Sequence, residues 1–177
     1  MNWEVLSKIK KFTELEEIFE KIGEPLFRLE NRPIYYMGEG FFIAYTEKKF
    51  RVENLNREEY GETGEYLLSI YYFNDINNIE LFFKIDRNNY NFDDKIKQNC
   101  FEIFKGITST VKFKEMQDKL RKNTDGIYYR EGESRALKNG EFEFKNKFIS
   151  YGNYTFLYFA KEKTTELGGV ELVLSEE

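Results

Sequence analysis

Two segments of this sequence carry apolar or aromatic side chains on both faces of a strand, and they set the first condition on the fold. In residues 66–73 and 154–160 nearly every position is aromatic or aliphatic. An antiparallel sheet with one face in water would instead alternate apolar and polar residues. Both faces of this sheet must therefore be covered, by helices together with a second sheet, a dimer partner or a ligand. A second sheet layer within one domain is the favoured arrangement.

Other segments rich in β-branched and aromatic residues flank these two and are separated by Gly, Asn and Glu-Lys turns. The first half of the chain predicts a meander, and its longest loop is the polar stretch 54–65, which contains two glycines. Its predicted strands are 34–37, 41–46, 50–54, 66–73 and 79–85. The second half predicts strands at 127–130, 141–144, 147–151, 154–160 and 170–174.

Helices are predicted at the start and in the middle of the chain. Residues 5–22 place apolar side chains at three-to-four spacing, and Gly23 and Pro25 end the pattern. The same periodicity predicts a second helix over 93–107 and a third over 111–122, with Thr110 as the N-cap of the third.

This order of elements predicts an α+β fold: an N-terminal amphipathic helix, an antiparallel meander, two central helices and a second antiparallel strand series. A length of 177 residues fits one domain, 1–177, with 1–92 and 93–177 as its two halves. Ile34-Tyr35-Tyr36 and Ile127-Tyr128-Tyr129 each follow a predicted helix and begin a strand series. A diverged duplication of the halves is therefore one alternative.

The residue types that are missing exclude several kinds of chemistry. The chain has no histidine and one cysteine, so it cannot form a Ser-His-Asp or Cys-His catalytic pair, a zinc site of cysteines and histidines, or an internal disulfide. Cys100 falls in the apolar stripe of the second predicted helix, which favours a buried small side chain over a reactive thiol. The sequence therefore predicts no cofactor, no bound metal and no catalytic activity.

One enzymatic alternative stays open, a carboxylate-metal-dependent nuclease. Glu143 and Lys145 form an acid-x-Lys pair inside a predicted strand, and Asp125 lies upstream as a second metal ligand. Similar pairs begin at Glu47 and Asp93. Their number matches chance for a chain with this content of acids and lysines, so the pattern by itself is weak.

The third predicted helix carries several basic residues and is followed by aromatic ones, a combination that single-stranded nucleic-acid binders use. Glu115 and Asp118 interleave with the lysines at the spacing of helical ion pairs, which favours a solvated helix face instead. Direct nucleic-acid binding is therefore disfavoured. The residues concerned are Lys112, Lys114, Lys119, Arg121, Lys122, Tyr128, Tyr129 and Arg130.

An acidic cluster is the best candidate for a binding site. The net charge is −5, and all of the excess lies in residues 1–88. A loop that presents several carboxylates around a tyrosine suits a basic protein partner, because charge steers the encounter and the aromatic ring anchors it. A solvated connecting loop is the competing interpretation. The predicted partner-binding residues are Glu58, Glu59, Tyr60, Glu62 and Glu65.

These features predict a small acidic cytosolic binding protein. The expected function is stoichiometric inhibition of a basic, nucleic-acid-handling protein, in the manner of immunity proteins or of phage-encoded anti-defence and anti-CRISPR proteins. The alternatives are a small-ligand-binding protein with an aromatic-lined cavity, and the nuclease. A homodimer stays open.

The expected location is the cytoplasm. The N-terminal residues lack an apolar run and a cleavage site, and the longest apolar stretch, 66–73, is far shorter than the roughly 20 residues of a membrane span. A single cysteine agrees with a reducing compartment. No membrane association is expected.

Overall fold

The structure is a computed structural model. It describes residues 20, 23–29, 32–54, 57–90, 95–96, 112–138, 141–161 and 164–174. Within the strands the description of residues 47–54, 57–66, 134–138, 141–145, 161 and 164–165 covers the backbone alone. The predicted helix 5–22 lies outside the described residues apart from Glu20, and so does Cys100. Of the predicted helix 93–107 only 95–96 are described, and they are not helical.

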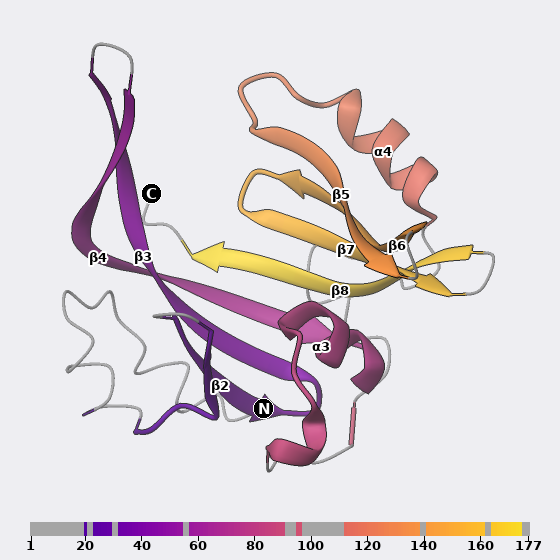
Figure 1. Cartoon of the computed structure of the whole chain (residues 1–177). Coiled ribbons are helices and arrows are strands. Elements are labelled where there is room, and N and C mark those ends of the chain that lie inside the picture. The colour runs from indigo at the N-terminus through magenta and orange to yellow at the C-terminus, as the bar shows by residue number, and fades with distance from the viewer. Residues whose placement is uncertain are drawn as a thin grey trace.

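The described strands form one antiparallel sheet (Figure 1). The sheet is an open one with the order β1-β2-β3-β4-β8-β7-β6-β5, so the described residues contain one sheet and not the expected second sheet layer. The strands are β1 (Phe27–Leu29), β2 (Arg32–Gly38), β3 (Phe41–Asn54), β4 (Arg57–Phe73), β5 (Tyr129–Lys138), β6 (Glu141–Tyr151), β7 (Tyr154–Lys161) and β8 (Thr164–Leu174).

The predicted α+β class is wrong for the described residues, which are mainly β. They contain two helices, α3 (Ile76–Phe83) and α4 (Phe113–Arg121), and one 3-10 turn, η1 (Arg87–Asn89). The difference arises because predicted short strands merge. Residues 41–46 and 50–54 belong to the single strand β3, and the predicted loop 54–65 lies largely within β4.

Helix α3 occupies a segment that the sequence predicted as a strand, 79–85. Asp75 caps its first turn, since a carboxylate oxygen accepts a hydrogen bond from the backbone N–H of Asn77 at 2.8 Å. Ile79 and Phe83, four residues apart, are both buried on the same face of the helix. Lys84 ends the helix in the left-handed conformation, with φ of 56°.

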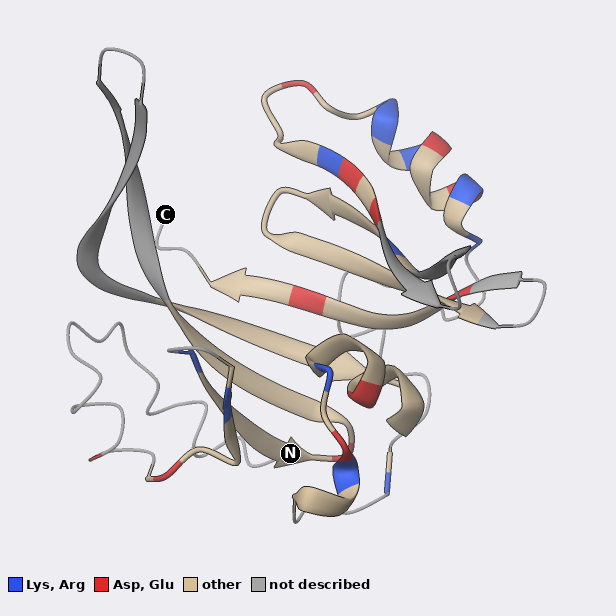
Figure 2. Ribbon diagram, in the orientation of Figure 1, with Lys and Arg blue, Asp and Glu red and all other residues tan. Residues whose placement is uncertain are grey.

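Helix α4 confirms the third predicted helix with shorter bounds. Lys112, not Thr110, stands at its N-cap, and the Glu115 side chain accepts a hydrogen bond from the Lys112 backbone N–H at 3.3 Å. Met116 is the one fully buried residue of α4. Both signs of charge line its outer side (Figure 2), which agrees with a solvated helix face.

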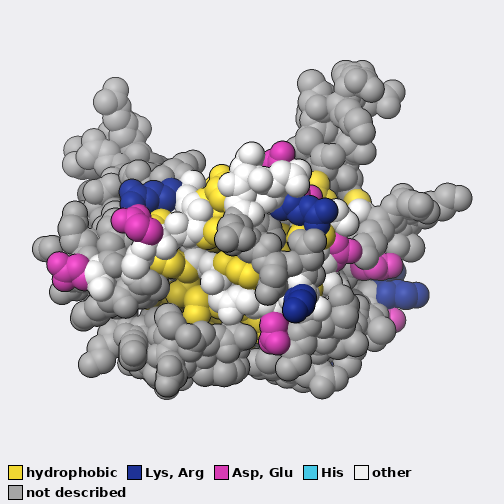
Figure 3. All heavy atoms as spheres, turned by 90° about the horizontal axis from the view of Figure 1, so that it is seen from below, with side chains coloured by type: hydrophobic (Ala, Val, Ile, Leu, Met, Phe, Trp, Pro, Cys, Tyr) yellow, Lys and Arg dark blue, Asp and Glu magenta, His cyan; other side chains and the backbone are white. Residues whose placement is uncertain are grey.

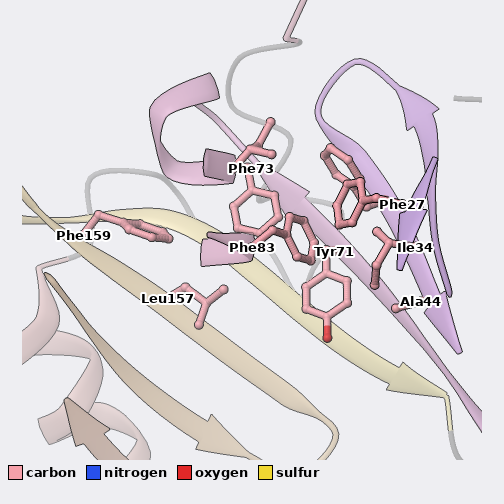
Figure 4. Packing of buried hydrophobic residues seen from close by; sticks show 10 residues of the cluster. Phe27, Ile34, Ala44, Tyr71, Phe73, Phe83, Leu157 and Phe159 are labelled. Carbon is pink, nitrogen blue, oxygen red and sulfur yellow. The ribbon is translucent and has the colours of Figure 1, made fainter. Parts of the chain in front are cut away.

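The two helices cover opposite faces of the sheet, because neighbouring residues along a strand belong to different buried clusters. The α4 face contains Phe41, Tyr72, Met116, Ile149, Phe156, Tyr158, Leu167 and Val170. The α3 face contains Phe27, Ile34, Phe42, Ala44, Tyr71, Phe73, Ile79, Phe83, Leu157 and Phe159, and its aromatic rings pack against one another (Figure 4). Apolar residues are therefore buried on both faces of the sheet, with one helix packed on each face.

Each half of the chain contributes four consecutive strands, and the two meanders meet where β4 pairs with β8. Tyr71 stands opposite Glu171 at this junction. The tripeptides that suggested a duplication occupy different places. Ile34-Tyr35-Tyr36 lies within the second strand of its meander, whereas Ile127-Tyr128-Tyr129 leads into the first strand of the other.

A buried polar contact joins α3 to an irregular point of β8. The side-chain amide of Asn78 donates to the Asn74 side chain at 3.1 Å and to the Gly168 carbonyl at 3.4 Å. The Asn74 backbone N–H donates to the same carbonyl at 3.1 Å. Gly168 lies where the β7–β8 register shifts, so these bonds satisfy a carbonyl that the strand ladder leaves free.

Candidate binding surfaces

A two-stranded arm, formed by the distal parts of β3 and β4, extends from the sheet (Figure 1). β2 pairs with β3 only as far as Ala44, and β8 pairs with β4 only from Leu68 onward. Residues 47–54 and 57–66 therefore pair only with one another among the described strands. At a rise of about 3.3 Å per residue the arm is about 30 Å long.

The predicted partner-binding residues lie in this arm, within strand β4 and not in a loop. Strand alternation puts positions 58, 60 and 62 on one side of the ribbon and position 59 on the other. The cluster Glu58, Glu59, Tyr60, Glu62 and Glu65 is therefore distributed along a strand. Of the two glycines that suggested a loop, Gly61 pairs with Phe50 of β3, and Gly64 lies where the β3–β4 register shifts, a position at which glycine is tolerated within a strand.

The arm also contains basic residues. In the β3–β4 register Lys49 stands opposite Glu62, and Arg51 stands opposite Tyr60. Glu53 stands opposite Glu58. Cross-strand neighbours of opposite charge attract each other weakly, and like charges repel. The register thus places Glu62 opposite a basic position and Glu58 opposite an acidic one.

A second candidate surface is the part of the α3 face formed by strands β5 to β8. One row of residues in register crosses the sheet there, and its members are largely polar, unlike the aromatic residues that α3 covers. The row consists of Arg130, Ser150, Thr155, Glu171 and Tyr71. Ser150 and Thr155 share a hydrogen bond of 3.0 Å. A sheet face in contact with water requires such residues.

Tyr71 links this polar row to the core. Its ring is buried, and its hydroxyl donates a hydrogen bond of 2.6 Å to the Glu171 carboxylate. Burial, with the nearby negative charge of Glu171, raises the pKa of Tyr71 well above its usual value. The pair is therefore a structural hydrogen bond across the junction of the two meanders, with the phenol in its neutral form.

Alkaline pH is expected to unfold the protein through such buried tyrosines. Burial raises the pKa of Tyr35 from 10.0 to about 12 and raises the pKa values of Tyr45 and Tyr158 further. Because the folded chain then holds protons that the unfolded chain releases, the free energy of unfolding is unaffected below about pH 10 and falls as the pH rises above it.

A titration that records tyrosinate absorbance and far-UV circular dichroism together tests this expectation. The buried tyrosines should ionise only as the circular dichroism signal is lost. Ionisation of all 13 tyrosines near pH 10 with the native signal retained would contradict it.

The basic and aromatic residues considered for nucleic-acid binding do not form one surface. Helix α4 packs on one face of the sheet, whereas the guanidinium of Arg130 lies 5.7 Å from the ring centre of Phe148, which packs on the other face. Tyr128 is 61% exposed, but Tyr129 is half-buried and donates to Glu131. Arg121 is engaged with Glu131 as well.

The residues of the nuclease alternative are also far apart. Position 143 of β6 pairs with Ala136, whereas Asp125 precedes the end of β5 that pairs with Tyr151. Eight positions of an extended strand, about 27 Å, separate residues 143 and 151. The backbone positions of Asp125 and Glu143 are therefore near opposite ends of the β5–β6 pair. Among the residues that the structure describes, no group of three or more Asp, Glu, His or Cys side chains could hold one.

Hydrophobic side chains gather near the centre of the surface seen from below, and charges of both signs surround them (Figure 3). Four large hydrophobic residues of the described part are exposed, Leu81, Ile127, Tyr128 and Leu174. None of the described helices is long and apolar enough to cross a membrane.

Comparison with known proteins found no matching family, no similar curated protein and no similar solved structure.

Proposed function

We propose that this chain is a stoichiometric binding protein that engages a basic protein partner through the β3–β4 arm. The observation that carries the proposal is the extension of β3 and β4 beyond both of their neighbours among the described strands, so that residues 47–54 and 57–66 form a separate ribbon. A two-stranded ribbon is marginally stable on its own and adds little to a hydrophobic core. Its extra length is therefore better explained by contact with a partner than by stability.

Charge supports the choice of partner. The β4 strand of the arm carries Glu58, Glu59, Glu62 and Glu65, and the whole chain carries a net charge of −5. A field of this sign accelerates encounters with a basic protein and slows encounters with nucleic acid. The proposed target is a nucleic-acid-handling protein, because its phosphate-binding groove is basic and a narrow acidic ribbon competes for it. Immunity and anti-defence proteins illustrate this class of activity.

The proposal includes a cytoplasmic location and no catalytic activity. The single cysteine of the chain suits a reducing compartment. The distance between the positions of Asp125 and Glu143 speaks against the nuclease alternative. In the described core the aromatic rings contact one another, as Phe73 does with Phe82 and Phe83 at 5.4 and 5.5 Å between ring centres. This packing favours a binding surface over an aromatic-lined cavity.

Reversing the charge of the arm should abolish tight binding. A tagged chain is used to capture its partner from host lysate at low and at high salt, and the affinity of the purified pair is then measured by titration calorimetry. Replacing Glu58, Glu59, Glu62 and Glu65 by Lys should weaken binding by about 100-fold or more at low salt, because four attractive contacts become repulsive. The parent complex should be one to one and weakened by salt.

A matched variant distinguishes the effect of charges on the arm from the effect of the net charge of the chain. Replacing Glu20, Glu24, Asp118 and Asp125 by Lys makes the same change of charge away from the arm, and its affinity should stay within about threefold of the parent. Circular dichroism confirms that both variants fold. The proposal fails if the arm variant binds like the parent, or if both variants lose affinity equally.

A further inference from the structure

Within the part of the chain that the structure describes, helix α4 is held on the sheet by few contacts, and they are of modest strength. Met116 is its one buried side chain, while Phe113 and Leu120 are half-buried. The Nζ atom of Lys147 lies 5.3 Å from the ring centre of Phe113, at the edge of the contact. A helix of nine residues is not stable in water without tertiary contacts. The position of α4 therefore depends on this small interface.

Glu131 of β5 binds the C-terminal half of α4. Its carboxylate accepts hydrogen bonds from the Gln117 side-chain amide and the Arg121 guanidinium. The Arg121 side chain is half-exposed, so water and salt weaken this ion pair. Beyond it, the Tyr151 hydroxyl donates to the Asn123 carbonyl at 2.7 Å and ties the C-terminal end of α4 to β6.

The sheet beneath α4 contains a buried polar group that has no hydrogen-bond partner among the described residues while α4 is packed on it. Tyr158 of β7 is fully buried, and its hydroxyl has no hydrogen-bond partner among the described residues. The Phe113 ring meets the Tyr158 ring edge-on, with 5.2 Å between ring centres. A buried hydroxyl without a partner has lost its hydrogen bond to water and gained none in exchange. Its burial therefore costs free energy and opposes the packing of α4 on the sheet.

We propose that α4 is a hinged cover that lifts from the sheet as one unit, pivoting at its C-terminal end, while strands β5 to β8 stay paired. The pairing of these strands runs through their own backbones and involves no residue of α4. Lifting the helix returns the Tyr158 hydroxyl to water and exposes the apolar side chains around it. This movement is independent of the arm and of the proposed partner.

Hydrogen exchange on the full chain tests the cover. The backbone amides of α4, residues 113–121, should show protection factors about 100-fold lower than those of residues 156–159 in β7, with a weaker dependence on denaturant. Tyr158→Phe should raise the protection of α4 about fivefold, because the closed state no longer buries an unpartnered hydroxyl. Glu131→Gln should lower the protection of α4 about threefold and leave β7 unchanged.

Tyr128→Phe is the matched control, since it removes an exposed hydroxyl outside the interface and should change nothing. Equal protection and equal denaturant dependence in α4 and β7 would overturn the proposal, because α4 would then open only in global unfolding. A gradient of protection from the helix ends inward, unaffected by Tyr158→Phe, would also overturn it, since that pattern belongs to fraying.

Discussion

Phe73→Ala should lower the free energy of unfolding by about 3 to 5 kcal/mol. Phe73 is completely buried at the end of β4 and contacts rings from three other elements, with Phe42, Phe83 and Phe159 at 6.1, 5.5 and 6.4 Å between ring centres. Its truncation removes apolar surface from the core and leaves a cavity that neighbouring rings cannot fill without breaking their own contacts (Figure 4).

Urea denaturation followed by far-UV circular dichroism measures this loss. Tyr128→Ala is the control, because an exposed aromatic residue outside the core should cost about 0.5 kcal/mol or less. A loss below about 1 kcal/mol for Phe73→Ala would show that the α3 face is not the principal core of the molecule.

Gly168→Ala should cost about 2 to 4 kcal/mol, although it adds a single methyl group. A Cβ atom at this position would stand 2.3 Å from the Nδ2 atom of Asn78 and 2.6 Å from the Cδ2 atom of Phe159. Both neighbours are buried, so the substitution must displace the amide that bonds the Gly168 carbonyl or move a core ring. Thermal and urea unfolding of the variant measure the cost.

Two comparisons identify this mechanism. Gly126→Ala places its methyl group in open space at φ of 70°, so its cost should be limited to backbone strain of about 1 kcal/mol. In an Asn78→Ala background Gly168→Ala should cost less than in the parent, because one of the two clashing groups is gone. Additive effects of the two substitutions would contradict the clash with Asn78.

The strands predicted from composition alone are in place wherever the apolar pattern runs on both faces. Residues 66–73 and 154–160 lie in β4 and β7 near the middle of the sheet, and the stretches 71–73 and 156–159 are buried on both faces. The pattern is reliable here because a strand covered on both sides can hardly place a polar residue anywhere. It does not reveal what the cover is, since helices and a second sheet both require an apolar face.

Residues 79–85 show where local reasoning failed. Their aromatic and aliphatic composition is typical of a strand, yet it also fits a short helix with Ile79 and Phe83 on one face. The choice depends on Asp75 as an N-cap and on the fit of Asn78 against Gly168, ninety residues away. A contact of that sequence separation leaves no trace in a local pattern.

The candidate partner-binding residues were selected by their charge, and the sequence placed them in a loop. Glu58, Glu59, Glu62 and Glu65 stood out because acidic residues concentrate there, but charges and glycines in the segment indicated a loop. The segment is a strand because β3 runs alongside it and pairs with it from Asn54 back to Phe41. In such a case the pairing with a neighbouring strand outweighs the low intrinsic β-propensity of glutamate and glycine.

The sequence by itself determined that both faces of β4 and β7 are apolar, that α4 is a helix, and that the chain can form neither a histidine-dependent catalytic pair nor an internal disulfide. These conclusions follow from composition and from periodicities of two and about 3.6 residues, which are local properties. The tertiary structure decided the single eight-stranded sheet, the helix at 76–83 and the arm. Each of these features depends on which strand or loop lies opposite a given segment in space. That neighbour is often distant in the chain, so a local sequence pattern does not reveal it.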